Sequence, residues 1–251
     1  VRRVTKIMHH KMAIIDGPRD DAKIDRARTA TLISGSGNWS TSAATQYDEN
    51  TLFLKGYSEL VLRMQREFDT LWAGSKDVVY NEAIVFDGTR ANISDEIIAQ
   101  YEDPNTDVFL TSPNFQSNGN GGWGALGTTV VTDALVNVIL THADESIHIS
   151  SGHFVSVPIA RAVRDAMLAK PQLDVTIALD CQETGKPGEV QDIKLELEQL
   201  GARVMYKCNT YRWHYKYAAQ LHHKYMVIDG DELYTGSLNF SDNAESGTFE
   251  N

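Results

Sequence analysis

Short apolar runs alternate with longer amphipathic segments along this chain, and the two kinds of block predict strands and helices in turn. Runs bounded by turn residues predict strands at 11–16, 31–34, 51–54, 83–86, 107–111, 146–150, 175–179 and 204–207, with 3–8 an earlier part of the first one. Apolar residues at helical spacing predict helices at 58–72, 132–141, 158–169 and 190–200. Strands that alternate with helices at this spacing predict a layered α/β fold.

A polar pattern interrupts these blocks twice, once near each end of the chain. It is a His, a Lys two residues later, an Asp five after the Lys, then Gly-Ser-x-Asn, and a Glu eleven past the Asn. In the first copy these residues are His9, Lys11, Asp16, Gly35, Ser36, Asn38 and Glu49. In the second copy they are His222, Lys224, Asp229, Gly236, Ser237, Asn239 and Glu250. Two copies of so specific a pattern identify an internal repeat.

The residue types in this pattern suit the cleavage of a phosphodiester. Side chains two apart on a strand share a side, so each His and its Lys point together, and we expect both pairs to converge on one pocket. One His can attack while the other protonates the leaving group, and Lys supplies positive charge. The Asn amides can donate to phosphoryl oxygens with support from the Ser hydroxyls, and each Glu can accept a ring N–H. The Asp residues, at odd spacing, are expected to face away and hold a turn.

This double pattern resembles the phospholipase D superfamily. The resemblance implies two similar α/β halves that share one active site, and a reaction through a covalent phosphohistidine without a metal or other cofactor. Water releases the intermediate in hydrolysis, and an alcohol does so in transfer reactions. In family members with both motifs on one chain the first His is usually the nucleophile. We therefore expect His9 to attack phosphorus and His222 to protonate the leaving group.

The two motifs have different lengths of chain before and after them, and this difference predicts the domain organisation. We expect residues 1–74 to be the C-terminal part of a first half, 75–82 a connection, and 83–251 a second half that lacks its last strand and helix. The first half therefore reads as truncated. By analogy between the repeats, we expect a parent protein with roughly a hundred more residues before Val1 and about twenty after Asn251. Any signal peptide would lie upstream of Val1, so the compartment is left open.

Composition narrows the choice of partners. The chain has 251 residues and is 42% hydrophobic. Its net charge of −11 argues against broad, nonspecific binding of polyphosphate. It contains no apolar run long enough to span a membrane. Its two cysteines, Cys181 and Cys208, lack metal-site spacing, and both a disulfide and two free thiols are compatible with the sequence.

The substrate is a choice between two classes. A His-His-Lys motif followed by GSxNW or GSxNF is similar to a bacterial and mitochondrial branch that includes nucleases and cardiolipin or phosphatidylcholine hydrolases. The acidic balance and the long loops of the second half favour a phospholipid, met at a membrane surface. An endonuclease that cleaves DNA or RNA is the alternative. A non-catalytic binding module is disfavoured because every motif residue is intact in both copies. Head group and oligomeric state are not predicted.

Four further features lie outside the repeat. Residues 17–30 predict a solvated polar loop or hairpin, and the Gly/Asn-rich segment 114–129 predicts a flexible rim loop instead of a nucleotide site, since it has no GK[ST] ending. Aromatic and cationic residues alternate over 211–217, which predicts a half-buried strand. The alternative is an amphipathic segment at the entrance of the site, where the aromatic side chains could contact the substrate. Most isolated histidines are expected to be structural, but His153, directly after a predicted strand, is a candidate for a role at the site. The structural set is His142, His148 and His214.

Overall fold

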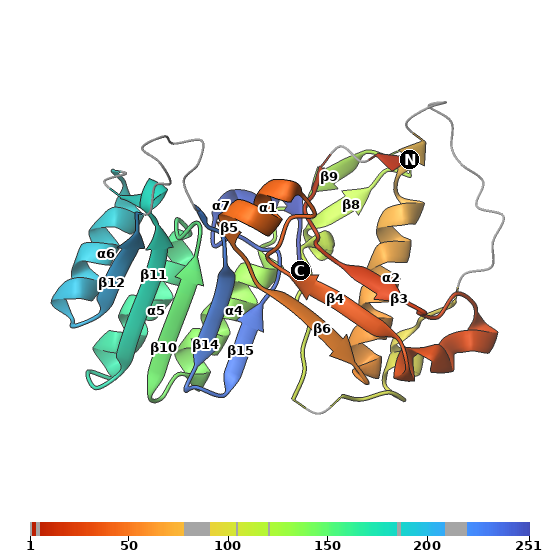
Figure 1. Cartoon of the computed structure of the whole chain (residues 1–251), viewed down its shortest axis with the longest axis horizontal. Coiled ribbons are helices and arrows are strands. Elements are labelled where there is room, and N and C mark those ends of the chain that lie inside the picture. Colours follow the sequence, from red (N-terminus) through yellow and green to blue (C-terminus); the bar gives the residue numbers. More distant parts are fainter. Residues whose placement is uncertain are drawn as a thin grey trace.

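The computed structural model describes residues 2–3, 6–77, 91–103, 105–119, 121–184, 187–208 and 220–251. The strand predicted at 83–86 and the aromatic segment 211–217, with His214, lie outside these residues. Two α/β halves stand side by side (Figure 1), which confirms the predicted fold class. No helix within the described ranges has both the length and the apolarity needed to cross a bilayer.

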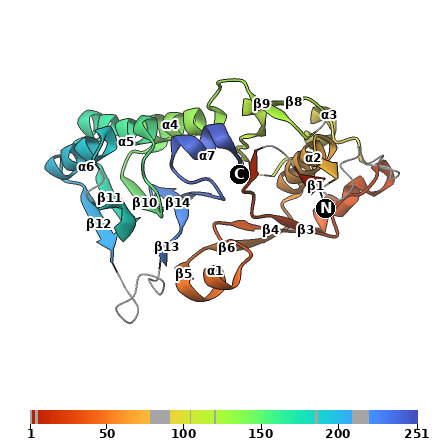
Figure 2. The same ribbon diagram turned by 90° about the horizontal axis from the view of Figure 1, so that it is seen from above.

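The second half is built on a five-stranded mixed sheet. In spatial order its strands are β12 (Arg203–Lys207), β11 (Asp174–Asp180), β10 (Ser146–Ser151), β14 (Lys224–Ile228) and β15 (Glu232–Thr235). The first three are parallel, while β14 is antiparallel to β10 and β15 to β14. Parallel neighbours need crossover connections, and helices supply them. One face of the sheet is covered by α4 (Val130–His142), α5 (Val157–Ala169) and α6 (Glu189–Gln199) (Figure 2).

The core of this half follows from the hydrophobic pattern. Alternate residues of the central strands are fully buried, among them Ile147 on β10 and Ile177 on β11, because strand side chains repeat with period two. They pack against one stripe of α5 that includes Ile159 and Val163. Pro158 lies in the first turn of α5, where its missing N–H is not needed. These strands and helices lie within two residues of their predicted ends.

The first half has an antiparallel sheet and one long helix. The sheet consists of β3 (Ala13–Ile15), β4 (Thr31–Gly35) and β6 (Thr51–Lys55), with β4 in the centre. The helix α2 (Ser58–Ala73) buries Val61, Leu62 and Met64 against Leu32 of β4. The short helix α3 (Asp95–Ile98) adds to the same cluster. Of the predicted connection 75–82, the described part forms β7 (Lys76–Asp77), which pairs with β1 (Arg2–Arg3).

The segment 17–30 departs from its prediction. It forms a 3₁₀ helix, η1 (Asp21–Arg28), instead of a loop or hairpin. Ala27 and Ala30 are fully buried in the core of the first half, while most of the charged residues stay in solvent. Two small apolar residues in a charged segment give almost no hydrophobic periodicity, and this is why the anchoring was missed.

Two segments of the second half also differ from their predictions. Residues 107–111 do not form a regular strand; instead the N–H of Thr111 donates to the carbonyl of Glu250 at 3.1 Å. Within 114–129 a short hairpin replaces the expected loop, formed by β8 (Phe115–Ser117) and β9 (Trp123–Ala125). Phe115 and Trp123 both meet the ring of Phe249 edge-on. Tertiary aromatic contacts thus hold a segment whose local sequence favours a loop.

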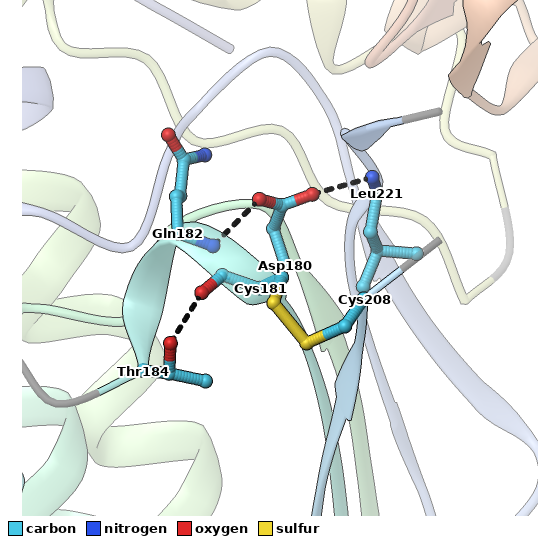
Figure 3. Close-up of a disulfide and its surroundings, with 6 residues drawn as sticks. All are labelled: Asp180, Cys181, Gln182, Thr184, Cys208 and Leu221. Atoms are coloured by element: carbon cyan, nitrogen blue, oxygen red, sulfur yellow. Dashed lines mark hydrogen bonds between the residues drawn. A yellow bond between two sulfur atoms is a disulfide. The ribbon is translucent and has the colours of Figure 1, made fainter. Parts of the chain in front are cut away.

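A disulfide joins Cys181 and Cys208, which decides between the two alternatives that the sequence left open (Figure 3). Cys181 begins the short helix η3 (Cys181–Glu183) directly after β11, and Cys208 directly follows β12. Because β11 and β12 are parallel neighbours, residues that follow their ends lie side by side, with the two Cα atoms 4.7 Å apart. The carboxylate of Asp180 accepts hydrogen bonds from the N–H groups of Gln182 and Leu221, at 2.9 and 2.8 Å.

Candidate active site

Two very short parallel strand pairs connect the halves and place the motif residues. One pair is β2 (Ile7–Met8) with β16 (Thr248–Phe249), and the other is β13 (Gln220–Leu221) with β5 (Tyr47–Asp48). In each pair, the residues before the His of one repeat lie beside the residues before the Glu of the other repeat. The N–H of His9 donates to Phe249 and that of His222 to Asp48, both at 3.0 Å. The chain therefore exchanges its two glutamates between the halves.

This exchange creates two crossed histidine–glutamate pairs. Nδ1 of His9 lies 2.7 Å from Oε2 of Glu250, and Nδ1 of His222 lies 2.7 Å from Oε1 of Glu49. An ionised carboxylate only accepts hydrogen bonds, so each Nδ1 carries the hydrogen. In both rings Nε2 is then the nitrogen available for attack or proton transfer.

The two glutamates are held by the serines of the GSxN segments. Ser36 donates to Glu49 at 2.7 Å and Ser237 donates to Glu250 at 2.6 Å. Each serine oxygen also accepts the backbone N–H of the residue after the glutamate, at 3.0 Å in both copies. Both serines are fully buried. Their hydroxyl hydrogens therefore point at the carboxylates, and the serines support the histidines through the glutamates.

Burial strongly affects the two lysines. Nζ of Lys11 donates to the carbonyl of His9 at 2.7 Å, and Nζ of Lys224 donates to the carbonyl of His222 at 2.8 Å. Desolvation lowers the pKa of Lys11 to about 8 and that of Lys224 to about 7, against the attraction of the two glutamates. A bound anion would favour the charged form of both side chains.

The pKa values of His222 and Glu49 are both lowered. Burial lowers the pKa of His222, and this effect outweighs the hydrogen bond to Glu49, which raises the pKa. Burial raises the pKa of Glu49, but the hydrogen bonds from His222 and Ser36 outweigh it and lower the pKa overall. Nζ of Lys224 also lies 3.1 Å from Nε2 of His222. In the protein alone, the carboxylate is ionised and the neutral imidazole is favoured.

The two asparagines follow the second strand of each motif. Asn38 and Asn239 are half-buried and precede the short helices α1 (Thr41–Gln46) and α7 (Asp242–Gly247). Ser40 and Ser241 cap these helices, accepting the N–H of the third residue on at 3.2 and 3.3 Å. The same capped turn therefore follows the asparagine in both repeats.

The motif glycines and aspartates shape the backbone. A Cβ on Gly35 or Gly236 would lie 2.2 or 2.1 Å from the carbonyl oxygen of Asn50 or Asn251, so a larger residue would push the glutamate-bearing segment away. Asp16 and Asp229 adopt left-handed turns with φ of 58° and 52°. The carboxylate of Asp229 accepts the N–H groups of residues 144–146 at 2.8 to 2.9 Å. It lies at the end of β14 opposite Lys224.

A second set of crossed contacts was not predicted. Nδ1 of His10 lies 3.1 Å from Oδ1 of Asn251, and Nδ1 of His223 lies 3.4 Å from Oδ1 of Asn50. On its other side, Nε2 of His10 lies 3.1 Å from Oε1 of Glu67 on α2, and both side chains are almost completely buried. The signal for this set is in the sequence, because both repeats read His-His-Lys and Glu-Asn.

The described residues contain no cluster of three or more His, Cys, Asp or Glu side chains placed to hold a metal ion.

A family model described as "Cardiolipin synthase, PLD-like domain" matches residues 1–72 and 136–251, which is most of the chain and includes both motifs. The chain belongs to this family of phospholipase D-like proteins. The match confirms the superfamily that the repeated motif indicated.

Comparisons with individual proteins agree with this assignment. Over 65 residues the chain is 38% identical to a mitochondrial cardiolipin hydrolase from Chlamydomonas reinhardtii, a match that covers 26% of this chain and only 23% of that relative. The phosphatidylserine synthase of Haemophilus influenzae Rd KW20 is similar over 97% of this chain and 56% of its own, at 10% identity and a TM-score of 0.53. A polyphosphate kinase from Porphyromonas gingivalis is similar over 98% of this chain and 30% of its own, at 12% identity and a TM-score of 0.52. At these identities the two structures show a shared fold.

The lysine pKa values generate a prediction about anion binding. Sulfate stays a dianion across the neutral range, so its affinity reports the charge of the protein. As the pH rises through about 7 and then about 8, Lys224 and Lys11 lose their protons, and we expect the affinity for sulfate to fall several-fold between pH 6.5 and 9. Isothermal titration calorimetry measures it. An affinity that stays constant over this range would show that the lysines are not the anion-binding groups.

Proposed function

We propose that this chain provides the active site of a phosphodiesterase that hydrolyses phospholipids through a covalent phosphohistidine. The observation that carries the proposal is the pair of crossed dyads. Two histidines from different repeats each have Nδ1 paired with a carboxylate, which leaves Nε2 for the reaction, and each repeat also contributes a buried lysine. Two identical side chains, equivalently oriented on one phosphate, suit the two opposite roles of nucleophile and acid.

In the proposed reaction, Nε2 of His9 attacks phosphorus and the bond to the leaving oxygen breaks. His222 gives its Nε2 proton to that oxygen as it leaves. In the second step His222 takes a proton from water, the water oxygen attacks phosphorus, and the bond between phosphorus and His9 breaks. An alcohol in place of water gives transfer. Lys11 and Lys224 stabilise the negative charge on the phosphoryl oxygens throughout.

The unequal surroundings of the histidines fit this division of roles when substrate binds. In the protein alone, Lys224 is placed to donate to Nε2 of His222, and this contact requires a neutral ring. A phosphate between the lysines would attract the ammonium of Lys224 and free Nε2 of His222. Its negative charge would also favour the protonated ring that an acid needs.

The net charge of the chain and the names of its family and relative favour a phospholipid over a nucleic acid as the substrate. A net charge of −11 disfavours an extended polyanion, which binding proteins usually meet with a broad basic surface. The family description and the algal relative both name cardiolipin. Cleavage of DNA or RNA would use the same chemistry, so the test must separate the two substrates.

The direct test is turnover by the full-length protein of labelled phospholipid vesicles and of labelled single-stranded DNA, each with and without EDTA. We expect release of phosphatidic acid from the vesicles, unchanged by the chelator, and little cleavage of DNA. The double variant His9→Asn/His222→Asn is the control for contaminating activity. Faster cleavage of DNA than of lipid would transfer the proposal to the endonuclease, and a loss of turnover in EDTA that added cation restores would contradict the metal-free mechanism.

The histidine roles predict where the phosphoryl group is trapped. With His222→Asn and a p-nitrophenyl phosphodiester, whose leaving group needs no proton, we expect a stable adduct on His9. With His9→Asn we expect no adduct. Mass spectrometry of the peptides locates the phosphoryl group. A phosphoryl group on His222 of the wild-type protein would reverse the assignment.

A further inference from the structure

A third histidine repeats the arrangement of the two motif histidines. Nδ1 of His153 lies 3.1 Å from Oε1 of Glu183, so that this ring too is paired through Nδ1 with a carboxylate. The Glu183 side chain is completely buried, whereas that of His153 is 33% exposed. Among the described residues, no hydrogen bond to Nε2 of His153 is found.

The backbone that leads into this third pair lies beside His222. Strand β10 ends at Ser151, which pairs with Lys224, and the N–H of Gly152 donates to the carbonyl of His223 at 3.0 Å. A Cβ on Gly152 would lie 3.7 Å from Cδ2 of His222. His153 therefore follows the residue that packs directly on the His222 ring.

The backbone around both His153 and Glu183 is fixed by further contacts. Ser151 donates to the carbonyl of His153 at 2.5 Å, and Gln182 donates to that of Gly152 at 3.4 Å. Glu183 belongs to the turn that the disulfide ties to the end of β12, and the preceding Asp180 also holds the N–H of Leu221, just before His222 (Figure 3). These contacts fix the His153 ring relative to the backbone around His222, as a residue that recognises the substrate requires.

The chemistry of the ring defines what it recognises. When Glu183 is ionised its carboxylate only accepts, so Nδ1 of His153 carries the hydrogen and Nε2 of the neutral ring is an acceptor. A group on the substrate must then donate to it. On the His222 side of the phosphate, that group belongs to the leaving alcohol, because His222 protonates the leaving oxygen in the proposed reaction.

We propose that His153 is a specificity-determining residue that accepts a hydrogen bond from a hydroxyl group of the leaving alcohol. It favours phosphodiesters with a hydroxylated head group, such as glycerol, over those whose head group has no donor, such as choline. This inference rests on the proposed function and on the acid role of His222. Glu183 is the positioning residue that keeps Nε2 of His153 an acceptor.

The test compares the full-length wild-type protein with His153→Phe and His153→Gln on phosphatidylglycerol and phosphatidylcholine, in the same mixed micelles at pH 8, where free imidazole is largely neutral. The readout is the ratio of the two kcat/KM values, which a general loss of stability does not change. We expect His153→Phe to lower the ratio about three- to tenfold, as for the loss of one hydrogen bond. His153→Gln, whose amide oxygen still accepts, should lower it less.

The matched control is His148→Phe, on the strand β10 that precedes His153 but half-exposed and away from the motif residues, which should leave the ratio unchanged. An unchanged ratio in His153→Phe, with both lipids cleaved, overturns the inference and leaves the proposed function standing. A wild-type protein that cleaves neither lipid overturns the proposed function and, with it, this inference.

Discussion

Each motif histidine depends on a carboxylate that the other repeat supplies, and the rest of the site follows from that exchange. Glu250 is almost completely buried, and a buried carboxylate is stable only when its oxygens are hydrogen-bonded. It finds its donors in His9, Ser237 and the hydroxyl of Thr248. Separating the halves would leave both glutamates without their histidines. The two halves therefore act as one unit at the site, even though each has its own core.

The buried lysines show the conflict between stability and function. Desolvation lowers the pKa values of both, so the protein without a bound anion holds them in an unfavourable environment. The same environment has a low dielectric constant, in which a charge acts more strongly on a phosphoryl oxygen than it would in water. Sites of this kind commonly reduce stability for the sake of binding or chemistry.

Much of this could be predicted from the sequence, and the misses have physical causes. Long, regular elements such as α5 and β11 lie where periodicity placed them. The exchange of Glu49 and Glu250 was not predicted, because spacing along the chain does not reveal which partner lies closest across a two-fold arrangement. The strands that enforce it are two residues long, too short to produce a pattern. The packing of Ala27 and the hairpin over Phe249 depend likewise on contacts distant in sequence.

The crossing of the dyads is the central claim, and NMR titration of the ring nitrogens tests it most directly. In Glu49→Gln we expect the Nδ1 and Nε2 resonances of His222 to shift and this ring to titrate differently, while His9, which is bonded to Glu250, is essentially unchanged. Glu250→Gln should do the reverse. If Glu49→Gln instead alters His9 and leaves His222 as it was, each repeat pairs its own histidine and glutamate, and the dyads are not crossed.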